Sequence, residues 1–142
     1  MTFAASMRIG TLEITTALAA AALIAARPRA RRSAEIAALQ PVSVVLRVVE
    51  LGRARLVERL CPLTIGRDRA CDLVLADPEV SRRHARLETE GGVVYLRDLE
   101  SRNGTFLNAR ALEGVVETRE GDVIDVGATR LIVEKLKAVP WT

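Results

Sequence analysis

Residues 85–107 read ARLETEGGVVYLRDLESRNGTFL and contain the clearest strand pattern of the chain. Apolar and polar residues alternate over 85–89 and again over 93–98, as they do in half-buried strands. Glu90-Gly91-Gly92 separates the two runs and is typical of a tight turn with positive φ. A polar loop then leads into Phe106-Leu107. This stretch therefore predicts a hairpin followed by a further strand.

Short strand patterns separated by turn residues continue over the rest of residues 42–137. Short β-branched or alternating runs predict strands at Val42–Val49, Arg55–Leu60, Pro62–Ile65, Leu73–Leu75, Val123–Val126 and Thr129–Glu134. Turn residues, mostly Gly, Asn, Asp and Pro, separate these runs. Closely spaced short strands of this kind are typical of an all-β sandwich or barrel. We expect a domain over 42–137 and a tail over 138–142.

The N-terminal part has a different composition. Residues 1–26 are apolar and Ala-rich, which predicts a helix. Only thirteen residues, Ile14–Ala26, are free of charge, whereas a membrane span needs about 17–25 apolar residues. A free or partner-bound helix, a membrane anchor over residues 9–26, and a segment without structure all remain open. Residues 27–41 are expected to be a basic linker.

The charges and cysteines limit the classes of function. The chain has a net charge of +3, but from residue 41 onward 16 basic residues face 16 acidic ones. We therefore expect no nucleic-acid-binding face on the domain. Two cysteines and one histidine at these spacings predict neither a disulfide framework nor a metal site. The sequence has no Gly-rich nucleotide loop and no carboxylate dyad. We expect no cofactor and no enzymatic activity.

Three polar clusters stand at strand ends. They are Gly66-Arg67, Ser81-Arg82-Arg83-His84 and Ser101-Arg102-Asn103-Gly104-Thr105. Loops at one end of a sandwich gather into one surface on a rigid scaffold. Arg67, Arg82 and Arg102 would supply bidentate cationic donors there, with a hydroxyl and an amide from the same clusters. This set of groups suits a phosphate dianion.

The ordered set Gly-Arg, Ser-Arg-x-His and Ser-x-Asn-Gly-Thr resembles the forkhead-associated (FHA) family. Asp98 and the pattern Gly121-Asp122-Val123-Ile124-Asp125-Val126-Gly127 are similar to the family as well. The resemblance covers about residues 42–136. It implies a β-sandwich of about 10–11 short, mostly antiparallel strands. It also implies a module that binds phosphothreonine peptides.

The resemblance assigns roles to individual residues. It implies that Arg67, Ser81, Arg82, Arg102, Asn103 and Thr105 bind the phosphopeptide, and that Gly66, His84, Gly104 and Asn108 shape the loops. Position 102 often carries a small hydroxyl residue in the family, so Arg102 either adds a third charged contact or points to solvent. Glu79, in a loop that often touches the third residue after the phosphothreonine, could favour a basic ligand residue.

The function expected from this resemblance is recruitment of proteins phosphorylated by a Ser/Thr kinase. A phosphate-independent scaffold, targeted by the N-terminal helix, is the alternative. We expect a cytoplasmic location, with membrane attachment through residues 9–26 as a variant. The excess of arginine over lysine and the abundant alanine and valine indicate a GC-rich, bacterial coding sequence.

Overall fold

The computed structural model describes residues 40–140. The expected helix over 1–26 and the basic linker up to residue 39 lie outside this range. Within it, no helix is long and apolar enough to cross a bilayer. The described part is all-β. Its strands are β1 (Val42–Glu50), β2 (Arg53–Leu60), β3 (Leu63–Gly66), β4 (Leu73–Val74), β5 (Ala85–Glu90), β6 (Val93–Asp98), β7 (Thr105–Leu107), β8 (Arg110–Ala111), β9 (Val115–Thr118), β10 (Val123–Val126) and β11 (Thr129–Ala138).

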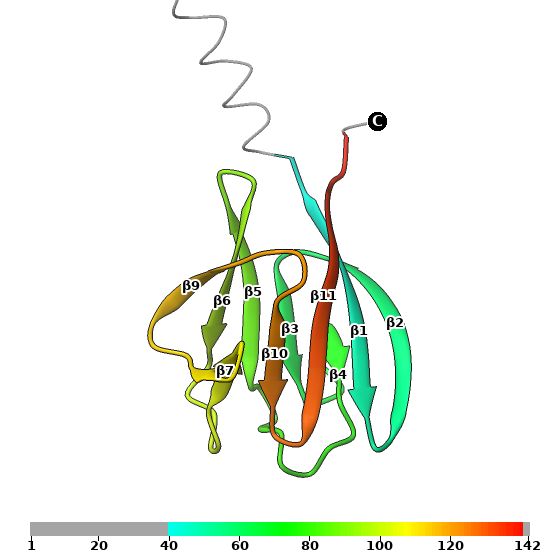
Figure 1. Ribbon diagram of the computed structural model, residues 1–142, viewed down its shortest axis with the longest axis vertical. Coiled ribbons are helices and arrows are strands. Elements are labelled where there is room, and N and C mark those ends of the chain that lie inside the picture. The colour runs from blue at the N-terminus through cyan, green and yellow to red at the C-terminus, as the bar shows by residue number, and fades with distance from the viewer. Residues whose placement is uncertain (1–39, 141–142) are drawn as a thin grey trace, which may run out of the picture. The chain divides into compact units, whose positions relative to one another are not determined.

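The strands form two sheets that pack face to face (Figure 1). One sheet has six strands in the order β2-β1-β11-β10-β7-β8, and the other has five in the order β4-β3-β5-β6-β9. Only β3 and β4 pair in parallel; the remaining pairs are antiparallel. The expected all-β sandwich of short, mostly antiparallel strands is confirmed.

The core lies between the sheets and consists of the inward-facing residues of both. Alternate positions along β1, β5, β6, β10 and β11 are buried, which matches the period of two in their sequences. Aliphatic side chains fill this space at close to zero exposure. The fully buried members include Val44, Leu46, Val48, Leu63, Ile65, Leu87, Leu96, Ile124, Leu131 and Val133.

Several observed strands begin or end one or two residues from the predicted bounds, and three differ more from the prediction. β11 runs to Ala138 because its pairing with β1 continues to the Val42–Ala138 pair. β8 and β9 were not predicted. β8 has two exposed residues and forms a hairpin with β7, with both turn residues, Asn108 and Ala109, at positive φ. β9 is an edge strand of four residues that pairs with β6, and its one buried residue, Thr118, is polar, so its sequence carries only a weak strand signal.

Candidate functional site

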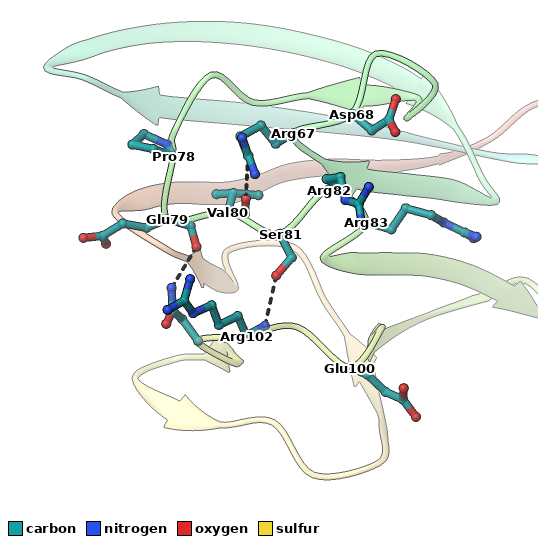
Figure 2. Close-up of a pocket in the computed structure, with 11 residues that line it drawn as sticks. Arg67, Asp68, Pro78, Glu79, Val80, Ser81, Arg82, Arg83, Glu100 and Arg102 are labelled. Carbon is teal, nitrogen blue, oxygen red and sulfur yellow. Dashed lines mark hydrogen bonds between the residues drawn. The ribbon is translucent and has the colours of Figure 1, made fainter.

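Three loops surround one hollow of about 990 Å³ at one end of the sandwich. The first follows β3, the second runs from β4 to β5, and the third joins β6 to β7. Figure 2 shows the side chains of these loops around the same space. Of the predicted ligand-binding residues, five line the hollow: Arg67, Ser81, Arg82, Arg102 and Asn103. Arg83 and Glu100 also line the hollow and were not among the predicted site residues; the sequence signal for Arg83 is its place in the Arg82-Arg83 pair.

Gly66 brings the first two loops into direct contact. The backbone N–H of Arg67 donates to the Ser81 carbonyl at 3.0 Å, and that of Asp68 donates to the Arg82 carbonyl at 3.0 Å. A Cβ on Gly66 would lie 2.2 Å from the Arg82 oxygen, closer than any real contact of this kind. The glycine is therefore required by the approach of the Ser81-Arg82 backbone to the end of β3.

His84 joins the second loop to the third and is fully buried. Its Nδ1 accepts the Ser81 backbone N–H at 3.0 Å, so the neutral ring carries its proton on Nε2. Nε2 then donates to the Gly104 carbonyl at 2.9 Å. This geometry is that of a loop-structuring residue, as the resemblance implies, since both ring nitrogens are occupied by backbone groups.

Asp77, which was not among the predicted site residues, anchors the second loop to the β10–β11 turn. The side chain is buried, and its Oδ1 accepts the Glu79 backbone N–H at 2.9 Å. Its Oδ2 accepts the Ala128 N–H at 2.7 Å and the Thr129 hydroxyl at 3.0 Å. Burial by itself raises the pKa of Asp77, but these three hydrogen bonds outweigh it and lower the pKa below its ordinary value. The signal that could have found it is the Asp-Pro pair that opens the loop.

Asp98 organises the third loop in the same way. Its carboxylate accepts the Ser101 backbone N–H at 3.0 Å and the hydroxyls of Ser101 and Thr105 at 2.6 Å each. Burial raises the pKa of Asp98, and the hydrogen bonds from Ser101 and Thr105 more than reverse this effect. The structure corrects the expectation for Thr105. Its side chain is buried, with the hydroxyl committed to Asp98, so it shapes the loop and does not line the hollow.

Asn108 also lies outside the hollow. Its amide nitrogen donates to Asp122 at 2.9 Å, and its Oδ1 accepts the Val123 N–H at 2.9 Å. These bonds fix the β7–β8 turn against the start of β10. Asn108 is therefore loop-structuring, as the resemblance implies, at a distance from the ligand-binding candidates.

The hydrogen bonds between the loops leave specific groups free to meet a ligand (Figure 2). Ser81 Oγ accepts the Arg102 N–H at 2.9 Å, so the Ser81 hydroxyl proton can be donated elsewhere. Asn103 Nδ2 donates to the Glu79 carbonyl at 2.9 Å, and Oδ1 of the same amide stays available as an acceptor. Arg67 uses Nε to hold the Val80 carbonyl at 3.2 Å, which directs its terminal nitrogens without occupying them.

The electrostatics of the hollow favour an anion. Four arginines line it, at positions 67, 82, 83 and 102, against three carboxylates at positions 68, 79 and 100. None of these arginines forms an ion pair with a carboxylate of residues 40–140. These arginines thus line one hollow without an ion-pair partner among the described residues. An anion with several oxygens can engage more than one such donor at once.

The FHA domain family model matches residues 63–127. A solved structure described as a structural and functional analysis of phosphothreonine-dependent FHA domain interactions is 31% identical. The similarity covers 71% of this chain and 99% of that one, with a TM-score of 0.55. The chain belongs to the FHA domain family. Three of the motifs on which the resemblance rests, at residues 66–67, 81–84 and 101–105, contribute residues to the hollow of this FHA domain.

Two further proteins are similar to this FHA domain. The FHA domain-containing protein FhaB of Mycobacterium tuberculosis is 39% identical over 70 residues, which is 49% of this chain and 45% of FhaB. The chain thus spans less than half of that relative. The yeast Dun1 FHA domain was solved in complex with a doubly phosphorylated peptide derived from Rad53. It is 26% identical with a TM-score of 0.58, and the similarity covers 72% of this chain and 79% of that one.

Proposed function

We propose that the FHA domain of this chain binds phosphothreonine-containing segments of partner proteins and acts by recruitment, without catalysis. The observation that carries this proposal is the group of arginines around Ser81 and Asn103 that have no counterion among the described residues. The comparisons support it, because solved relatives are associated with phosphothreonine-dependent interactions and with a phosphorylated peptide.

In the proposed mode of binding, Arg67 and Ser81 contact the phosphate directly. The Arg67 guanidinium supplies charged donors and the Ser81 hydroxyl supplies a neutral one. Arg82 and Arg102 add positive charge beside them, and the free Oδ1 of Asn103 accepts a backbone N–H of the ligand. Each hydrogen bond to a charged group contributes about 1.5–3 kcal/mol. The phosphate is therefore the main source of affinity, and neighbouring ligand residues supply specificity.

A phosphothreonine ligand requires an earlier phosphorylation step, so the proposal places the domain downstream of a Ser/Thr kinase. We assign this activity to the cytoplasm. Membrane attachment through residues 9–26 is an extension of the proposal, which fractionation of cells expressing the full chain would decide.

Calorimetric titrations of the full chain with individual phosphothreonine peptides, and with the same peptides unphosphorylated, test the proposal. We expect Arg67→Ala to weaken binding at least about tenfold, because it removes charged hydrogen bonds to the phosphate. Arg47→Ala is the matched control, since Arg47 pairs with Glu134 on β11 and does not line the hollow. Equal binding of phosphorylated and unphosphorylated peptides would refute phosphate recognition and favour the scaffold alternative.

A further inference from the structure

Glu50, the last residue of β1, connects the six-stranded sheet to the β4–β5 loop, which belongs to the other sheet and borders the hollow. Its Oε1 accepts the backbone N–H of Ala76 at 2.5 Å and that of Asp77 at 3.1 Å. The Glu50 side chain is only 13% exposed, and Arg55 Nη2 lies 4.0 Å from its second oxygen. Glu50 does not line the hollow, so an effect of this residue on a ligand has to pass through the loop.

The β4–β5 loop is attached to the six-stranded sheet at two points, and Glu50 is one of them. The other is Asp77, whose carboxylate is bonded to the β10–β11 turn. Farther along the loop, Pro78 has no N–H, and the N–H groups of Glu79 and Val80 are both bonded to Asp77, at 2.9 and 3.1 Å. Removing the Glu50 carboxylate therefore leaves two backbone N–H groups without an acceptor among residues 40–140 and releases one of the two attachments.

The loop that Glu50 holds supplies the acceptors that orient two of the ligand-binding candidates. Asn103 Nδ2 donates to the Glu79 carbonyl at 2.9 Å, and Arg67 Nε donates to the Val80 carbonyl at 3.2 Å (Figure 2). A shift at the start of the loop therefore moves both carbonyls and changes the directions of the Asn103 amide and the Arg67 guanidinium. Side chains that are held in place before binding give tighter complexes, because less ordering is left for the moment of association.

We propose that Glu50 is a positioning residue for phosphopeptide binding. Its carboxylate fixes the start of the β4–β5 loop and thereby holds Arg67 and Asn103 in their binding directions before the ligand arrives. This inference rests on the proposed function and adds to it a residue that lies outside the hollow. Without the two hydrogen bonds from Ala76 and Asp77, the loop has to be ordered when the ligand binds. Ordering one interface side chain at that moment lowers affinity about two- to tenfold.

Three substitutions of Glu50 separate the reach of its side chain from its charge. Glu50→Gln loses the charge but keeps an oxygen at the same reach, and in the wild type a single oxygen accepts both N–H groups. Glu50→Asp keeps the charge but is one methylene group shorter, and Glu50→Ala removes the acceptor. The full-length variants are titrated with the phosphothreonine peptide that the wild type binds most tightly. We expect Glu50→Asp and Glu50→Ala to weaken binding about three- to tenfold and Glu50→Gln to stay within about twofold of the wild type.

Glu58→Ala is the matched control. Glu58 on β2 also accepts a hydrogen bond, from the Ser43 hydroxyl at 2.6 Å, but it does not line the hollow, so its loss should leave affinity unchanged. Hydrogen exchange followed by NMR gives a second readout. The N–H groups of Ala76 and Asp77 should exchange faster in free Glu50→Asp than in the wild type, and slow down again when the phosphopeptide is bound. A merely structural role would lower the urea midpoint and leave the Kd of the folded variant unchanged.

Each outcome of these titrations decides the inference. If Glu50→Asp and Glu50→Ala bind the phosphopeptide as tightly as the wild type, Glu50 does not position the site, while the proposed function still stands. Equal losses in Glu50→Gln and Glu50→Ala would show that the charge acts and not the two hydrogen bonds, which also overturns the inference. If Glu50→Ala does not fold, the comparison of Glu50→Asp with Glu50→Gln decides. If the wild type binds phosphorylated and unphosphorylated peptides equally, the proposed function fails and this inference fails with it.

Discussion

Replacing Asp77 by asparagine keeps the size of the side chain but removes hydrogen-bond acceptors at the base of the β4–β5 loop. The wild-type carboxylate accepts three hydrogen bonds in a buried site. Asparagine has the same size but exchanges one oxygen for an NH2 group. If the remaining oxygen faces Ala128 and Thr129, the Glu79 N–H meets a donor. If it faces Glu79, the other two groups lose their acceptor.

The expected change in the free energy of unfolding follows from the hydrogen bonds that the substitution alters. One hydrogen bond to a charged acceptor is lost, at about 1.5–3 kcal/mol, and a buried N–H is left unsatisfied. The two remaining bonds lose the charge of their acceptor. We therefore expect Asp77→Asn to lower the free energy of unfolding by about 2–4 kcal/mol near neutral pH. A domain of this size is stable by about 5–15 kcal/mol, so the variant should fold, with a clearly lower midpoint.

The dependence on pH has a definite sign. Because the folded-state pKa of Asp77 lies below its ordinary value of 3.8, the ionised carboxylate stabilises the fold above that value. This contribution is lost as the pH falls from 3.8 through the folded-state pKa. The stability difference between wild type and Asp77→Asn should therefore be constant from about pH 7 to pH 5 and shrink in stronger acid.

Urea unfolding followed by circular dichroism, at a series of pH values, measures this difference. Asp125→Asn is the control, because its ion pair with Arg130 is partly exposed, at 59% for the Arg130 side chain and 25% for that of Asp125, and contributes about 1 kcal/mol. A loss below about 1 kcal/mol for Asp77→Asn, or a difference that does not change in acid, would show that Asp77 does not anchor the loop as described.

Two further substitutions test the site from other directions. Gly66→Ala places a methyl group 2.2 Å from the Arg82 carbonyl oxygen. We therefore expect the free energy of unfolding to fall by about 3 kcal/mol or more. A variant with wild-type stability would contradict the close approach of the two backbones. Glu79→Lys reverses an exposed charge at the rim of the hollow. Peptides with Lys at the third position after the phosphothreonine should then lose about two- to fivefold in affinity relative to peptides with Glu there, in paired titrations. An unchanged affinity ratio would remove Glu79 as a specificity determinant.

Several features of the site could be read from the sequence because they depend on short-range patterns. Gly66-Arg67, Ser81 and Asn103 each follow or precede a recognisable strand, and their order along the chain is what resembles the family. The structure then places these residues around one hollow. Thr105 belonged to the same motif, but its contact depends on where Asp98 lies. No pattern within the motif distinguishes a side chain that faces the ligand from one that faces an internal carboxylate.

The amino-acid sequence by itself determined the all-β class and the main strands, because alternation and turn residues act over a few neighbouring positions. Tertiary structure decided the partners of the polar groups. Asp77 accepts a hydrogen bond from the Ala128 N–H, 51 positions away, and the ion pair between Asp125 and Arg130 needs β10 and β11 in register. Such contacts depend on which distant backbone groups approach one another when the two sheets close. That approach is set by the packing of the whole core and by no local run of residues.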